Sequence, residues 1–174
     1  MSWEVLRSQH LLDCRVFKIR RDLSRDLNHG LEHDFFVIES PDWINVIPVT
    51  TDGRIIMIEQ YRHGINELTL EIPGGMVDEG ELPVEAATRE LLEETGFRTS
   101  AIELLARTRP NPAIQNNWLY SFIARDCIFE QPAQGDITEQ INVRLVTPEE
   151  VPQLIAEGSI NHSLVVTAFQ YWQK

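Results

Sequence analysis

Carboxylate side chains are unusually dense between residues 71 and 94 of this 174-residue chain. A single base, Arg89, faces eight acids in this stretch, namely Glu71, Asp78, Glu79, Glu81, Glu85, Glu90, Glu93 and Glu94. Clustered carboxylates are hard oxygen ligands, which select Mg²⁺ or Mn²⁺, and protein-bound Mg²⁺ commonly joins a few carboxylates to a substrate phosphate. The cluster therefore indicates divalent-metal chemistry on phosphate.

Helical periodicity places three of these acids on one side of a helix predicted from Pro83 to Thr95. Pro in the first turn and Gly96 just past the end are typical helix boundaries. At about 100° per residue, Glu90, Glu93 and Glu94 fall within an arc of roughly 100°. A different side, suited to packing on a sheet, carries Val84, Thr88, Leu91 and Thr95.

A solvated, glutamate-rich surface helix is the alternative interpretation, because Glu is a good helix former. The charge pattern opposes it. Glu81 with Glu85, and Glu90 with Glu94, are like-charged pairs four residues apart, and each pair costs roughly a few tenths of a kcal/mol. Acids at the C-terminal end of a helix are also disfavoured by its dipole. A bound cation would relieve both penalties.

Strand patterns surround this helix on both sides. Alternating and β-branched stretches predict strands at residues 3–12, 15–21, 35–39, 44–49, 54–60, 67–72, 102–107, 118–124 and 142–146. Further helices are predicted from residue 147 to about 156 and at 163–172. We expect an α/β chain with helices packed on a mixed sheet, divided into a strand region at 1–43 and a main domain at 44–174.

Composition narrows the classes of partner. The net charge of −12 argues against binding to nucleic acid or to an anionic membrane, because both require a basic surface. The apolar runs are too short to cross a bilayer, and Met1–Glu4 resembles no signal peptide. Cys14 and Cys127 are too few for a disulfide framework and are expected to be reduced core thiols. We therefore expect a cytoplasmic protein.

The acidic segment resembles the signature of the Nudix hydrolases at every fixed position. Gly75 is followed, after five residues, by Glu81 and, after seven more, by the run 89–97, Arg-Glu-Leu-Leu-Glu-Glu-Thr-Gly-Phe. The resemblance implies an α/β/α sandwich around a mixed sheet. It also implies hydrolysis of a nucleoside diphosphate linked to another group.

The resemblance assigns roles to individual residues of the segment. Mg²⁺, with Mn²⁺ as the alternative, would be held by Glu90, Glu93, Glu94 and a backbone carbonyl of Gly74 or Gly75. Arg89 would orient the glutamates, Glu93 above all. Glu81 would be a supporting acid or, alternatively, a helix-start residue attracted by the helix dipole.

Features outside the signature are similar to the ADP-ribose pyrophosphatase and nucleotide-sugar hydrolase branch. They are the run 59–62 followed by 71–75, the position of Pro112, and the late acidic segment 138–143. The implied substrate is ADP-ribose or another nucleoside diphosphate sugar, cut to a nucleoside monophosphate and a sugar phosphate. In that branch the N-terminal strands exchange across a two-fold dimer and help to bind the nucleotide, so we expect a homodimer.

Two candidates lie outside the helix. Arg62 offers a guanidinium fork suited to a diphosphate, although a surface arginine at the end of a strand fits the pattern equally. Glu139 matches the loop glutamate that resembling enzymes use as a general base. A glutamate that ligates two cations has a lowered pKa and is a poor base, which weakens Glu93 for this role. A metal ligand, or an ordinary exposed acid, is the alternative for Glu139.

Other functions compatible with the signature are hydrolysis of nucleoside triphosphates or dinucleoside polyphosphates, and non-catalytic nucleotide sensing. Sensing domains of this kind usually lack one or more of the glutamates, whereas this chain keeps all of them. A plain acidic metal-binding module is a further alternative, and the phosphate-directed features oppose it.

Overall fold

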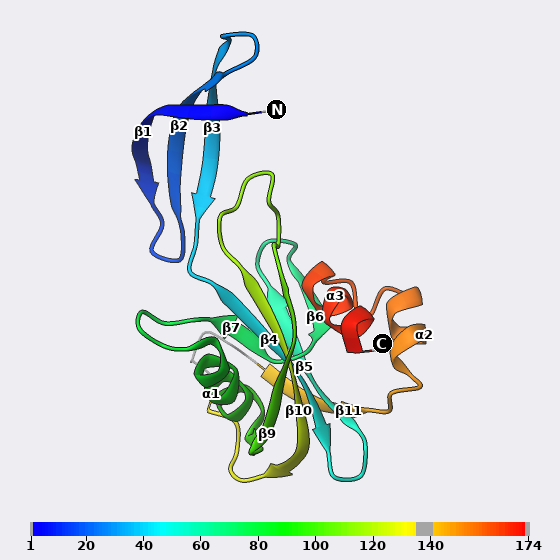
Figure 1. Ribbon diagram of the computed structural model, residues 1–174. Helices are drawn as coiled ribbons and strands as arrows, with labels where there is room; N and C mark the ends of the chain where they lie inside the picture. The colour runs from blue at the N-terminus through cyan, green and yellow to red at the C-terminus, as the bar shows by residue number, and fades with distance from the viewer. Residues whose placement is uncertain (1, 135–140, 173–174) are drawn as a thin grey trace. The chain divides into compact units, whose positions relative to one another are not determined.

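The computed structural model of the protein describes residues 2–134 and 141–172 (Figure 1). Its strands are β1 (Trp3–Asp13), β2 (Lys18–Asp26), β3 (Glu32–Glu39), β4 (Trp43–Thr50), β5 (Ile55–Arg62), β6 (Glu67–Glu71), β7 (Gly74–Met76), β8 (Phe97–Arg98), β9 (Ala101–Thr108), β10 (Leu119–Phe129) and β11 (Ile141–Val146). Its helices are α1 (Pro83–Thr95), α2 (Val151–Ala156) and α3 (Ser163–Trp172). The chain forms two compact units, one of Met1–Asp42 with Arg109–Trp118 and one of Trp43–Thr108 with Leu119–Lys174.

The second unit is built on an eight-stranded sheet. Its main path runs β11-β5-β4-β10-β8, while β6 pairs with β5, β7 with β4 and β9 with β10. The pairing of β10 with β4 is parallel, and the other pairs are antiparallel. The sheet is therefore mixed, as predicted.

Helices cover both faces of this sheet, because neighbouring strand residues point to opposite sides (Figure 1). On β4, Val46 belongs to a buried cluster with Leu91 of α1, while Ile47 belongs to a cluster with Phe169 of α3. The buried residues of β5 are distributed between the same two clusters. The predicted α/β/α sandwich is confirmed.

Helix α1 has the bounds that its sequence predicts. Pro83 opens it, and the Glu85 carboxylate accepts a hydrogen bond of 2.9 Å from the backbone N–H of Leu82. Gly96 closes it in the left-handed conformation, with φ of 75°, and its N–H donates to the carbonyl oxygen of Leu92. A residue with a side chain would strain this cap.

The first unit is a separate three-stranded antiparallel sheet in the order β1-β2-β3. The strand predicted at 15–21 begins instead at Lys18, because residues 14–17 form a turn in which Cys14 N–H donates to the carbonyl oxygen of Phe17. Segment 109–118 joins this unit through a bridge between Ile38 and Gln115. All of β1 is exposed, including its apolar side chains.

Within the described residues, no helix combines the length and apolar character that a bilayer span requires. Both cysteines are free. Cys127 lies in the core beside α1, and burial raises the pKa of its thiol to about 11. Cys14 is only half-buried, so the prediction of a core thiol is wrong for that residue, which lies in the turn before β2.

Candidate active site

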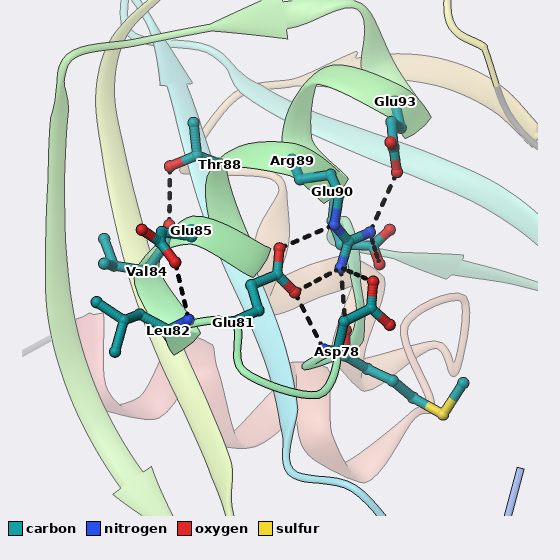
Figure 2. Close-up of polar contacts among 10 residues, drawn as sticks. Asp78, Glu81, Leu82, Val84, Glu85, Thr88, Arg89, Glu90 and Glu93 are labelled. Atoms are coloured by element: carbon teal, nitrogen blue, oxygen red, sulfur yellow. Dashed lines mark hydrogen bonds and ion pairs between the residues drawn. The ribbon is translucent and has the colours of Figure 1, made fainter.

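Arg89 of α1 lies at the centre of a carboxylate cluster (Figure 2). Its Nε and Nη2 donate to the two carboxylate oxygens of Glu81, each at 3.0 Å. Its Nη1 donates to Glu90 at 2.8 Å and to Glu93 at 3.2 Å. Its Nη2 also donates to the carbonyl oxygen of Met76 at 3.1 Å, which ties α1 to β7. One guanidinium thus holds three of the acids in fixed positions.

The charges of this cluster stabilise one another. Hydrogen bonds to Glu81, above all, raise the pKa of Arg89, while partial burial opposes the shift. The pKa of Glu81 is lowered, chiefly by the Arg89 guanidinium. Arg89 is therefore a permanent cation and Glu81 an ionised partner. Because Glu81 receives two of its bonds, Arg89 is held by the segment before α1 as well as by the helix glutamates.

The glycine pair Gly74 and Gly75, at the start of β7, lies against two helix glutamates, Glu94 and the Arg89-bonded Glu90. The backbone N–H of Gly74 donates to Glu94, which is buried, at 2.9 Å. A Cβ added at Gly75 would collide with the carboxylate of Glu90, and one at Gly74 would lie 2.5 Å from the carbonyl oxygen of Ile44. Gly74 is therefore confined by backbone and requires glycine, whereas at Gly75 the end of the Glu90 side chain would have to shift. The close approach brings Glu90 and Glu94 to the backbone of the glycine pair.

Glu93 shares the Nη1 donor of Arg89 with Glu90. Its side chain is 48% exposed, against 15% for that of Glu90. In residues 2–134 and 141–172, no three His, Cys, Asp or Glu side chains gather as a metal-ligand set.

The donors at the glycine pair nevertheless suit a hard divalent cation. Glu90 and Glu94 supply carboxylates next to the half-buried backbone of the two glycines. Mg²⁺ needs only one or two protein carboxylates, because substrate phosphate and water complete its coordination. The residues present therefore fit such an ion. The other predicted catalytic residue, Glu139, lies outside the described residues.

A pocket of about 790 Å³ opens beside the same glycine pair in the second unit. Gly74 and Gly75 form part of its wall. Its apolar lining includes Trp43, Ile65, Ile72, Met76, Leu119 and Leu164, and its polar lining includes Asn45, Arg62, Thr69, Glu71 and His162. A volume of this size is typical of sites for small organic ligands.

Arg62 lies in this pocket and forms a two-fold ion pair with Glu71. Its Nε and Nη2 donate to the two carboxylate oxygens of Glu71 at 2.7 and 2.8 Å. The Glu71 side chain is only 3% exposed, and it also accepts hydrogen bonds from Thr69 and His162. Burial alone would raise the pKa of Glu71, but these bonds outweigh burial and lower it. Glu71 is therefore a buried anion.

Sequence reasoning missed the roles of Glu71 and His162 in the pocket. Arg62 and Glu71 lie on neighbouring antiparallel strands, β5 and β6, but they are not register partners, since Arg62 pairs with Glu67 and Glu71 pairs with Ile58. His162 is separated from Glu71 by 91 positions along the chain. No local pattern indicates that contact, because it depends on how the start of α3 packs near β6.

Comparisons with known proteins identify a family and relatives for this chain. The family model of the NUDIX domain matches residues 41–168. A methanol dehydrogenase activator of Bacillus methanolicus is 30% identical over 171 residues, which cover 98% of this chain and 92% of that protein. An ADP-ribose pyrophosphatase of Bacillus subtilis (strain 168) is 29% identical over 149 residues, covering 85% of this chain and 80% of its own. A crystal structure of an ADP compounds hydrolase has the same fold, with a TM-score of 0.88 and 22% identity over 99% of this chain and 93% of its own.

Proposed function

The chain belongs to the NUDIX family and is a Nudix hydrolase, and from this premise we propose that it cleaves the diphosphate of ADP-ribose or of another nucleoside diphosphate sugar. The products would be a nucleoside monophosphate and a sugar phosphate. The names of the related ADP-ribose pyrophosphatase and of the ADP compounds hydrolase NudE of Escherichia coli, 28% identical over 111 residues, support this substrate class.

One observation carries the proposal: the glycine pair that lies against Glu90 and Glu94 also forms part of the wall of the pocket that contains Arg62. A diphosphate bound there would have carboxylates for a cation on one side and a guanidinium within the same pocket. The pocket's apolar lining suits a nucleoside or sugar ring.

Nudix hydrolases generally use divalent metal ions, and we infer Mg²⁺ here, with Mn²⁺ as the alternative. Glu90, Glu94 and the backbone of Gly74 or Gly75 would hold it, and Glu93 is a third candidate ligand. A bound ion of this kind supplies Lewis acidity and lowers the pKa of a water ligand.

The chain's own residues would do the remaining work. Arg89 fixes the positions of Glu90 and Glu93 through its hydrogen bonds. Arg62, oriented by Glu71, would contact the diphosphate through its guanidinium. Glu139 is proposed as the carboxylate that accepts a proton from the attacking water, on the strength of its place in the sequence.

A substrate panel tests the proposal. With Mg²⁺ present, kcat/KM is measured for ADP-ribose, other nucleoside diphosphate sugars, nucleoside triphosphates and a dinucleoside polyphosphate, by anion-exchange separation of each substrate from its products. We expect a diphosphate sugar to have the highest value. A higher value for a triphosphate or for the dinucleoside polyphosphate would contradict the substrate class. Binding of these nucleotides without turnover of any of them would support a sensing domain instead.

A further inference from the structure

Glu71 is a buried carboxylate with a complete set of hydrogen-bond donors. One of its oxygens, Oε1, accepts from Arg62 Nε at 2.7 Å and from Thr69 Oγ1 at 2.6 Å. The other, Oε2, accepts from Arg62 Nη2 and from His162 Nδ1, each at 2.8 Å. Burying an ionised carboxylate is costly unless it is paired and hydrogen-bonded. An apolar side chain at this position would fill the space without that cost. Stability alone therefore does not account for a charged residue here.

Two hydrogen-bond donors of Glu71, Arg62 and His162, differ from it in exposure. The Glu71 side chain is 3% exposed, whereas those of Arg62 and His162 are 41% and 37% exposed, and all three line the pocket. The carboxylate thus lies behind two side chains that reach the pocket surface. It sets the spacing and direction of both.

The hydrogen bond to Glu71 also fixes the chemistry of the His162 ring. An ionised carboxylate only accepts, so Nδ1 must carry a proton. In the neutral ring with that tautomer, Nε2 is an acceptor, and it lies on the edge of the ring away from Glu71. The backbone is fixed as well, since the carbonyl oxygen of His162 accepts from Val165 and Val166 at 3.0 Å in the first turn of α3.

We propose that His162 is a specificity-determining residue, which accepts a hydrogen bond through Nε2 from a sugar hydroxyl of the substrate, and that Glu71 is the positioning residue that fixes His162 together with Arg62. This inference rests on the proposed function, because it assigns different pocket residues to two groups of a nucleoside diphosphate sugar. Arg62 binds the anionic diphosphate, and His162 binds a sugar hydroxyl. A ligand with both groups at the matching spacing is then favoured over a phosphate compound that lacks hydroxyls.

Two substitutions separate contact with the substrate from support of Glu71. In His162→Asn, the amide nitrogen takes the place of Nδ1, so the bond to Glu71 is kept and the Nε2 contact is lost. In His162→Gln, the amide reaches the place of Nε2, so an acceptor is kept there and the bond to Glu71 is lost. His162→Ala removes both. The exposed His63, which contacts the ring of Tyr61 and does not line the pocket, provides the matched control His63→Ala.

Binding of ADP-ribose and of inorganic pyrophosphate is measured by calorimetry in EDTA, with thermal melting as a check on folding. We expect His162→Asn and His162→Ala to weaken ADP-ribose binding about tenfold, the effect of one lost hydrogen bond of about 1.4 kcal/mol. Pyrophosphate binding should change less than twofold, because it offers no hydroxyl. His162→Gln should retain most of the affinity for ADP-ribose, and His63→Ala should match the wild type.

The opposite order would overturn the contact: His162→Asn would bind ADP-ribose like the wild type, and His162→Gln would bind it as weakly as His162→Ala. His162 would then be a purely structural support of Glu71. Equal weakening for ADP-ribose and pyrophosphate would overturn the hydroxyl assignment, as would a wild-type protein that binds ADP-ribose no more tightly than pyrophosphate. These outcomes concern binding. Failure of the proposed function would appear separately, as wild-type protein that binds ADP-ribose with the expected dependence on His162 and does not hydrolyse it in Mg²⁺.

Discussion

Arg89 and Glu71 are the centres of two charge networks that differ in burial. The Arg89 side chain is 30% exposed and divides its donors among Glu81, Glu90 and Glu93. The Glu71 side chain is almost fully buried and collects its donors from three residues. Water screens the first network in part, whereas in the second it reaches Arg62 and His162 but hardly reaches the Glu71 carboxylate. Loss of charge should therefore affect the fold more at Glu71 than at any acid around Arg89.

Glu71→Gln tests the buried network through the pH dependence of stability. The pKa of Glu71 lies below its ordinary value of 4.5 in the folded protein, so the ionised form stabilises the fold above that pH. This stabilisation is lost as the pH falls towards the folded pKa. We expect Glu71→Gln to lower the free energy of unfolding at pH 7 by about 2 kcal/mol, the cost of lost hydrogen bonds to a charged group, because the Arg62 side chain that remains is 41% exposed.

Urea unfolding at pH 7, 5 and 3.5 measures the effect. The gap between wild type and Glu71→Gln should narrow at the lowest pH, where the wild-type carboxylate loses part of its advantage. Glu103→Gln, at an exposed position of β9, is the control and should follow the wild type at every pH. A gap that widened on acidification would mean that Glu71 is not ionised in the folded protein.

Glu139→Gln tests the proposed general base. Removing the proton acceptor should lower kcat roughly 10²-fold or more while KM changes little. Glu93→Gln should instead also weaken the dependence of the rate on Mg²⁺, as expected for a metal ligand. Both are measured by steady-state kinetics over a range of Mg²⁺ concentrations. Near-normal kcat for Glu139→Gln would move the search for the base to the glutamates of α1.

At the scale of elements, the sequence patterns correctly predicted the features that depend on local interactions. Helix α1 was predicted with its observed bounds, because Pro83 and Gly96 are boundary residues whatever the tertiary context. Strand β7 was missed, since Gly74 and Gly75 have low strand propensity and pair with β4 through tertiary packing. The same distinction applies to the site. Signature spacing identified Glu90 and Glu94, whereas the contact of His162 with Glu71 depends on the packing of distant elements.

The end of α1 depends on Gly96 for two reasons that can be separated. The residue has φ of 75°, and a Cβ there would also collide with the carbonyl oxygen of Gln131. Gly158, past the end of α2, has φ of 84° but no neighbour within 4 Å of an added Cβ. Gly158→Ala should thus cost about 1 kcal/mol from backbone strain alone.

Gly96→Ala should cost clearly more, about 3 kcal/mol, because the collision is with backbone that cannot move as a side chain does. Chemical denaturation of both variants, with the wild type alongside, gives the comparison. Equal losses for the two alanines would show that the contact with Gln131 is relieved at no cost and that only the backbone conformation matters.

At the scale of the whole molecule, every residue of β1 in the first unit is exposed, so this strand contributes no buried apolar side chain. Exposed apolar side chains on its strands and turns include Trp3, Val5, Leu6, Leu11, Leu12, Leu31, Phe35 and Phe36. Exposed apolar surface on a sheet of this kind is typical of an interaction surface. We propose that a second copy of the chain covers it, in a homodimer.

Light scattering tests the dimer. At micromolar concentration the mass should be twice that of the 20.1 kDa chain. The double variant Val5→Glu, Leu12→Glu, which places charges on β1, should shift the mass towards that of one chain, while Glu4→Gln on the same strand should leave it unchanged. A wild-type mass near that of a single chain would contradict the proposal.

The central claim is that the carboxylates of α1 and the adjoining pocket hydrolyse a diphosphate sugar with the help of a divalent cation. Anion-exchange analysis of the products formed from ADP-ribose, with Mg²⁺ and with EDTA, tests it most directly. The account predicts AMP and ribose phosphate in equal amounts with Mg²⁺, none in EDTA, and a rate lowered at least 10²-fold in Glu94→Gln of unchanged fold. Full hydrolysis in EDTA, or cleavage to ADP and free ribose, would contradict it.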